Sequence, residues 1–190
     1  MKQARSTYWL YVTLLAAALV AGCAAPARLE QMQVDTSLAQ RTAAAASPLA
    51  ATVAIKDVTG GSSTNPMWLS KISSSEFERA LEASLRTAGL LAANRQAGPY
   101  TLVADLISLD QPYIGVSLTV TVTVKYWLVE RTSGKTVYEK TIATPHTAAF
   151  GDAFIYSERL RLANEGAMRA NISRLIEELI ALKVAALELR

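Results

Sequence analysis

The sequence predicts an α+β fold, a two-layer sandwich in which a mainly antiparallel sheet of about four strands carries two helices on one face. Apolar and polar residues alternate strictly from 116 to 128, as in a strand with one buried face. Apolar residues recur at helical spacing over 73–88 and 157–182. Together with shorter strand signals, these segments give the order strand, helix, strand, strand, strand, helix.

The first strand is predicted over residues 51–58, where Val53 and Ile55 point to the same side. The stretch 60–66 is rich in glycine and serine and ends in proline, so we expect a loop there. It lacks the Gly-Lys-Ser/Thr ending of a phosphate-binding P-loop, which favours a plain connection. Trp68 follows in the same loop, where it either covers an edge of the sheet or is exposed to a partner.

The first helix is predicted to begin after Ser73, because Glu76 follows three residues later and the pair has the form of a capping box. Gly89 can adopt the left-handed conformation that ends a helix. The residues expected to face the core lie on one stripe of this helix: Phe77, Ala80, Leu81, Ser84, Leu85 and Ala88.

Three strands are predicted to follow as an antiparallel meander. The strand over 100–109 has apolar residues on both faces, so it is either central or contacts a further element. A turn over 111–115 leads to the alternating strand over 116–128, and the reversal at Ser133 and Gly134 leads to a strand from 136 to about 143. The alternating strand should bury its aliphatic side and expose Thr119, Thr121, Thr123, Lys125 and Trp127, a surface for a partner or an ordinary solvated face.

The final helix is predicted over 157–182, with Ser157 as its cap. Three aromatic residues precede it in the segment 148–156: Phe150, Phe154 and Tyr156. They either pack the start of the helix onto the sheet or form a contact site, since aromatic residues dominate binding hot spots. The candidate partner contacts are therefore Trp68, Phe150, Phe154, Tyr156, Thr119, Thr121, Thr123 and Trp127.

The first 22 residues have the three parts of a secretory signal: a cationic start with Lys2 and Arg5, an apolar run over 8–20 and small residues at its end. The run ends in Val-Ala-Gly followed by Cys23, the only cysteine. This arrangement resembles the lipobox of bacterial lipoprotein precursors. A transmembrane anchor is disfavoured because the apolar run is shorter than the roughly 20 residues that span a bilayer, and a buried thiol would not need small neighbours.

The resemblance implies cleavage between Gly22 and Cys23, a diacylglycerol on the sulfur, and a third chain such as palmitate on the freed amine. By the same resemblance, Ala24 favours the outer membrane, with the domain in the periplasm. The segment 23–50 is rich in alanine and is predicted to be the lipidated cysteine and a flexible tether, with a short strand within 29–38 as an alternative. Residues 51–190 are then a single domain.

The composition excludes several classes of function. The signal holds two of the cations and no acid, so the formal charge falls from +3 to +1 in the mature chain and gives no reason to expect nucleic-acid binding. His146 is the only histidine, and with Cys23 lipidated no thiolate is left for a metal, so no metal or cofactor is expected. Asp105 and Asp110 could pair for acid and base chemistry, but a strand carboxylate and a turn former explain them as well.

Anchor, tether and small α+β domain together resemble periplasmic lipoproteins that accompany envelope machinery, such as auxiliary lipoproteins of lipid transport and activators of cell-wall synthases. The resemblance implies a non-catalytic, lipid-anchored binding or assembly module with an envelope protein as partner. The alternative is a carrier or sensor of a small amphiphile held between helices and sheet. An enzyme with an unrecognised site is the third hypothesis.

Overall fold

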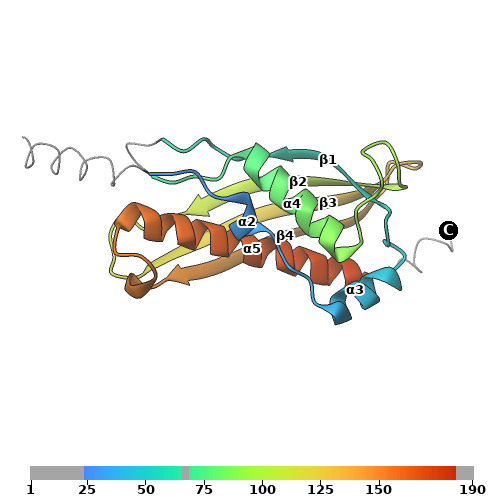
Figure 1. The fold of residues 1–190 in the computed structure, drawn as a ribbon. Helices are drawn as coiled ribbons and strands as arrows, with labels where there is room; N and C mark the ends of the chain where they lie inside the picture. The colour runs from blue at the N-terminus through green and yellow to red at the C-terminus, as the bar shows by residue number, and fades with distance from the viewer. Residues whose placement is uncertain (1–23, 66–68, 183–190) are drawn as a thin grey trace, which may run out of the picture.

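The computed structural model describes residues 24–65 and 69–182, which form a sheet with helices on one face (Figure 1). The predicted α+β class is confirmed. The elements, in chain order, are α2 (Leu29–Met32), α3 (Leu38–Ala45), β1 (Val53–Thr59), α4 (Ser74–Ala88), β2 (Tyr100–Asp110), β3 (Leu118–Glu130), β4 (Thr136–Ala148), the 3-10 turn η1 (Phe150–Asp152) and α5 (Tyr156–Ala181).

The sheet has the strand order β1-β2-β3-β4. The last three strands form the predicted antiparallel meander, in which Val103 lies opposite Trp127 and Trp127 opposite Glu139. β1 runs parallel to β2, because α4 carries the chain back across the sheet between them. The sheet is therefore mixed, with β1 and β4 at its edges.

The core lies between the sheet and the helices. β3 alternates buried and more exposed residues from Leu118 to Leu128, which confirms the predicted buried face over this range. Val116, predicted on the same face, precedes the strand and is 72% exposed. At the centre, the rings of Phe77 from α4 and Tyr126 from β3 meet edge to face, 6.5 Å between centres. Both side chains are fully buried, which is worth roughly 1.5–3 kcal/mol for a large apolar side chain.

Helix α4 has the predicted ends. The amide of Glu76 donates to Ser73 Oγ at 3.2 Å, and the amide of Ser73 donates to a Glu76 carboxylate oxygen at 2.9 Å, which completes the capping box. Gly89 ends the helix with φ of 78°, a conformation that glycine adopts without steric cost. The six residues predicted to face the core are all buried.

Two boundaries in the last third of the chain differ from expectation. α5 begins one residue before Ser157, and its N-cap is Ile155 without a side-chain hydrogen bond, so the predicted cap is wrong. β4 continues to Ala148, past its predicted end near residue 143, and therefore includes His146. β4 continues because it stays paired with β3 as far as Leu118.

The segment before β1 is the main correction. Residues 24–50 were expected to be a flexible tether, but they pack across α4 and α5, and the alternative strand within 29–38 is replaced by the short helix α2. Met32 and Leu49 are fully buried, and Ala44 packs with them in the common core. The alanine-rich composition did not predict this packing. A few large apolar residues are enough to bury such a segment when its other residues are small and can lie close to neighbouring helices. The described domain thus begins well before residue 51.

Candidate functional site

The aromatic segment forms the connection between β4 and α5 at one end of the sheet (Figure 1). The rings of Phe150 and Phe154 meet edge to face at 5.3 Å, and the guanidinium of Arg159 lies 5.2 Å from the centre of the Phe150 ring. Phe150 is 46% exposed and Phe154 78% exposed. Two interpretations were open for this segment: packing of the helix start onto the sheet, or an exposed contact site. Tyr156 is partly buried and fits the first, whereas Phe150 and Phe154 are exposed and fit the second.

The β2–β3 loop lies beside this segment. Tyr156 Oη donates a hydrogen bond to the carbonyl of Pro112, and Arg159 Nη2 donates to the carbonyl of Gly115 at 3.4 Å. The two loops together expose a set of large apolar side chains, which we call the apolar tip: Tyr113, Ile114, Val116, Phe150, Phe154 and Ile155. Sequence reasoning found only the two phenylalanines. The signal for Tyr113 and Ile114 was the lack of charge in the predicted turn over 111–115.

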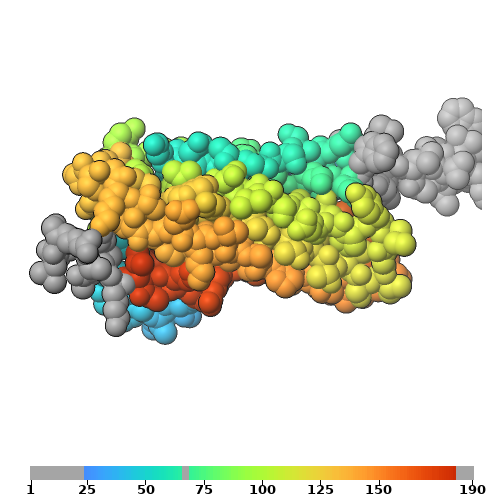
Figure 2. All heavy atoms as spheres, turned by 180° about the vertical axis from the view of Figure 1, so that it is seen from behind, coloured from blue at the N-terminus to red at the C-terminus, as the bar shows by residue number. Residues whose placement is uncertain are grey.

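The threonine row lies on the face of the sheet that the helices leave uncovered (Figure 2). Thr119 is exposed, and its hydroxyl lies 2.8 Å from that of Thr147 on β4. Thr121, Thr123 and Trp127 follow on the same face and are partly exposed. The structure thus brings four of the predicted partner contacts onto one surface.

Lys125 lies on the same uncovered face and contacts both Trp127 and Glu139. Its Nζ lies 4.8 Å from the centre of the Trp127 ring and 2.7 Å from a Glu139 carboxylate oxygen. The hydrogen bond and charge of Lys125 hold the pKa of the Glu139 carboxyl below its usual value. The face therefore presents hydroxyls, an indole ring and a charge pair.

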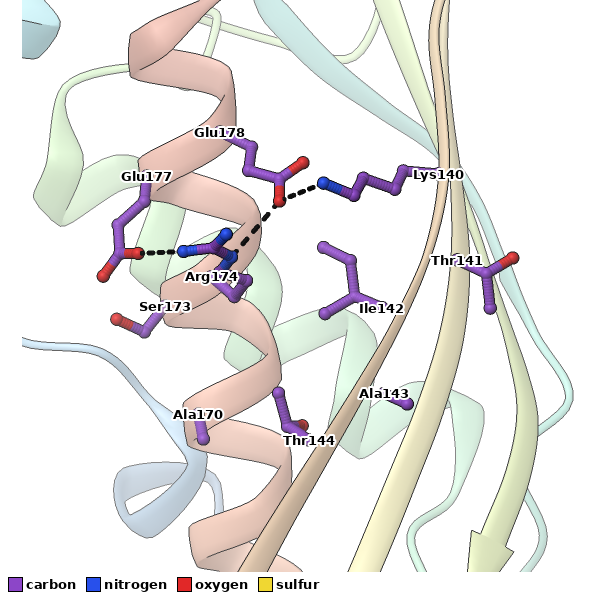
Figure 3. Close-up of a pocket in the computed structure, with 10 residues that line it drawn as sticks. All are labelled: Lys140, Thr141, Ile142, Ala143, Thr144, Ala170, Ser173, Arg174, Glu177 and Glu178. Carbon is purple, nitrogen blue, oxygen red and sulfur yellow. Dashed lines mark hydrogen bonds and ion pairs between the residues drawn. The ribbon is translucent and has the colours of Figure 1, made fainter.

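A groove of about 490 Å³ runs between β4 and α5 (Figure 3). Glu178 is central to its charged end, where its carboxylate lies 2.6 Å from Lys140 Nζ and 3.2 Å from Arg174 Nε. Partial burial opposes ionisation of Glu178, but the hydrogen bonds from Lys140 and Tyr138 outweigh it and its pKa lies below the usual value. The polar partners already present satisfy this carboxylate.

The residues considered for catalysis do not form one site. Asp105 accepts a hydrogen bond from the Thr59 hydroxyl at 2.7 Å, and Asp110 accepts one from Ser108 at 3.0 Å, so each has a local structural role. His146 lies on β4 against α5 at Gly166. Within residues 24–65 and 69–182, no three His, Cys, Asp or Glu side chains are grouped as metal ligands. None of the helices in these ranges is long and apolar enough to cross a bilayer.

Three predicted residues lie outside the described part of the chain. They are Gly22 and Cys23 at the predicted cleavage site and Trp68 in the β1–α4 connection. Their predicted roles remain predictions.

The fold and surfaces define a class: a two-layer α+β domain with one uncovered sheet face and an apolar tip. The sequence matches no protein-family model and no curated protein. Among solved structures, it is similar to a Xanthomonas campestris protein of the DUF330 family, with 14% identity over 72% of this chain and 88% of that chain and a TM-score of 0.54. This similarity establishes a shared fold.

Two further similar structures have lower TM-scores. A candidate lipoprotein from Caulobacter crescentus is 9% identical, over 75% of this chain and 93% of that chain, with a TM-score of 0.46. A minor lipoprotein from Acinetobacter baumannii is also 9% identical, over 70% of this chain and 94% of that chain, again with a TM-score of 0.46.

Proposed function

We propose that this chain is a bacterial lipoprotein held at the outer membrane by acylated Cys23, with a periplasmic domain that acts as a non-catalytic binding or assembly module for envelope machinery. The anchor is supported by the Val-Ala-Gly-Cys motif directly after a short apolar run with a cationic start. Two or three acyl chains bind a bilayer firmly, whereas one alone binds marginally.

The observation that carries the binding role is the uncovered face of β2, β3 and β4 (Figure 2). β3 and β4 are each 13 residues long, so this face is large for a small domain. Its threonine hydroxyls can exchange hydrogen bonds with a partner, and Trp127 offers the type of side chain that dominates binding hot spots. Ile107 of β2 is 53% exposed and adds an apolar contact.

The alternative function, a carrier of a small amphiphile, placed its ligand between the helices and the sheet. That space holds the protein's own side chains: Phe77, Leu102, Tyr126 and Leu128 are all fully buried there. Ligand sites in carriers are cavities of about 300–1,000 Å³ that enclose most of the ligand. The groove beside β4 reaches this volume, but it is an open surface feature with charged residues along one end.

Metabolic labelling with an alkyne fatty acid tests the anchor. The native precursor should incorporate the label, and Cys23→Ser should not. Ala25→Ser is the matched control, since it changes a neighbouring small residue and keeps the cysteine. An unlabelled native chain would contradict the lipoprotein assignment.

Photo-crosslinking in intact cells tests the binding role. A photoreactive residue at Thr119 or at Trp127 should capture an envelope protein, whereas one at the exposed Arg41 of α3 should not. Capture of only a second copy of the chain from both sheet positions would count against an envelope partner on this face. Native mass spectrometry of the acylated protein gives an independent check, because a copurified amphiphile in the domain would favour the carrier.

A further inference from the structure

Large exposed apolar side chains are concentrated at one end of the described molecule. Eight such side chains are exposed in total, and six of them form the apolar tip. Tyr113, Ile114 and Phe154 are the most exposed, at 85%, 87% and 78%. Scattered single residues of this kind are ordinary on protein surfaces, but a cluster on adjacent loops indicates an interaction site.

The two loops of the apolar tip contain no basic residue, and hydrogen bonds from the buried Arg159 hold them together. The β2–β3 loop from Gln111 to Ser117 contains no charged residue, and the turn from 149 to 155 contains only Asp152. The carboxylate of Asp152 accepts a hydrogen bond of 2.7 Å from the amide of Ala149, so the local backbone uses it. Arg159 is 4% exposed and links the loops through hydrogen bonds to the carbonyls of Ala153 and Gly115. Insertion of a preformed tip avoids the entropy cost of ordering it.

The chain also enters the domain at this end. The described segment begins there and runs along α5 into α2 (Figure 1). Ala24 is 5% exposed and Ala27 4%, and the amide of Arg28 is bound to Glu165 on α5 at 2.8 Å. Cys23 is covalently joined to a packed residue, and a residue spans at most about 3.6 Å. Acyl chains on Cys23 would therefore have no spacer between them and the domain.

We propose that the apolar tip inserts into the leaflet that holds the acyl chains of Cys23 and so fixes the orientation of the domain on the lipid surface. This inference rests on the proposed lipid anchor. Exposed aromatic and aliphatic side chains such as these bury favourably at the boundary between headgroups and acyl chains. The long axis of the sheet then points away from the bilayer, which leaves the uncovered face of β3 and β4 open to the periplasm along its length.

The test places an environment-sensitive fluorophore on the tip. Mature chain with Cys23→Ser carries Ile114→Cys for the label and an N-terminal His tag, and binds vesicles of phosphatidylethanolamine, phosphatidylglycerol and a nickel-chelating lipid. The tag replaces the acyl chains, so this arm does not depend on acylation. The matched control carries the label at Lys135→Cys, in the turn at the opposite end of the meander.

We expect the label at position 114 to shift to shorter emission wavelength and to be quenched by lipids with a spin label near the headgroup, while the label at 135 stays unchanged. Adding Phe154→Asp should reduce quenching at 114 to the level seen at 135. Equal, weak quenching at both positions would overturn the proposal. A wavelength shift that appears without vesicles and grows with protein concentration would also overturn it, since a second copy would then cover the tip.

The native acylated chain with Ile114→Cys, reconstituted in the same vesicles without the chelating lipid, separates the two hypotheses. If the His-tagged chain shows quenching at position 114 but the native precursor does not associate with membranes, the lipid anchor at Cys23 is rejected and insertion of the apolar tip is supported. Membrane association without quenching at position 114 would keep the anchor and reject the tip.

Discussion

The carboxylate of Glu165 accepts a hydrogen bond of 2.8 Å from the backbone amide of Arg28, a residue 137 positions earlier in the chain. The Glu165 side chain is 1% exposed, and Arg161 Nη1 on the preceding turn of α5 lies 3.4 Å from its carboxylate. The Arg28 guanidinium also donates to this carboxylate, from Nε at 3.3 Å, and this side-chain hydrogen bond raises its pKa. A buried carboxylate thus joins the segment nearest the predicted anchor to the longest helix.

Glu165→Ala should destabilise the domain strongly. The change leaves the buried Arg161 with less compensation and removes the acceptor for the Arg28 amide, and breaking a buried ion pair costs about 3–5 kcal/mol. Arg28→Ala is the matched control: its side chain is 46% exposed and its amide survives the change, so we expect a loss below about 1 kcal/mol. Urea unfolding measures both, and similar small losses would show that the carboxylate does not hold the segment.

Asn171→Ala should cost about 2–3 kcal/mol, because buried polar groups lose their partners. Asn171 accepts a hydrogen bond from Tyr126 Oη at 2.8 Å and donates to the carbonyl of Ile142 at 2.8 Å. Combined with Tyr126→Phe, the loss should be smaller than the sum of the single losses, since the hydroxyl that was left unpaired is gone. Additive losses in calorimetry or urea unfolding would show that the two side chains do not act as a unit.

Stability should fall above about pH 10, the ordinary pKa of tyrosine. Burial raises the pKa of Tyr126 well above that value, and burial together with the hydrogen bond to Glu178 raises the pKa of Tyr138. Both phenols stay neutral in the folded protein while they ionise in the unfolded chain. The free energy of unfolding therefore falls as pH rises, by up to about 1.4 kcal/mol per pH unit for each group. Below that pH their contribution is constant.

Tyr126→Phe should therefore show a shallower loss of stability between pH 9 and 11 than the wild type, because it removes one of the tyrosines whose pKa is raised in the fold: Tyr126, Tyr138 and Tyr156. Urea unfolding at a series of pH values measures the slopes. Tyr113→Phe on the exposed tip is the control and should leave the slope unchanged. The same slope in Tyr126→Phe as in wild type would contradict the assignment.

The effect of Gly166→Ala on stability should depend on the residue at position 146 of β4: destabilising beside His146 and stabilising beside alanine. A Cβ at Gly166 would lie 2.1 Å from His146 Cδ2, so the imidazole must move, at a cost of about 1–3 kcal/mol for overpacking. In a His146→Ala background the clash is absent, and the helix preference of alanine over glycine should stabilise the domain by about 1 kcal/mol. Thermal unfolding of the four proteins measures this, and destabilisation in both backgrounds would assign the role of the glycine to the backbone instead.

Local signals predicted the parts of the fold that depend on neighbours in the sequence. Ser73, Glu76 and Gly89 specify the ends of α4, and the alternation in β3 specifies its buried face, because these patterns act over a few residues. The parallel pairing of β1 with β2 and the packing of Met32 depend on contacts between distant segments, and neither has a local pattern. Extension of β4 past Pro145 was missed for a similar reason: an edge strand can include a proline whose missing amide is not needed for pairing.

The two candidate surfaces differ in the same way: one follows from a local sequence pattern, and the other depends on contacts between distant segments. The threonine row was predicted in full, since alternation alone assigns residues to a face. The apolar tip was predicted only at Phe150 and Phe154, because the contribution of Tyr113 and Ile114 arises from two loops that meet in space. A clue was present in the lack of charge from Gln111 to Ser117, which is unusual for an exposed turn.

Truncation provides a direct test of the segment that sequence reasoning assigned to a tether. A chain that starts at residue 51 should lose most of its stability, because it removes the buried side chains of Met32 and Leu49, each worth about 2–5 kcal/mol in a core, and exposes the faces of α4 and α5 beneath them. Domains of this size have only about 5–15 kcal/mol in total. A chain that starts at Ala24 keeps these contacts and is the matched control. Circular dichroism during heating compares the two, and equal midpoints would show that residues 24–50 are a tether after all.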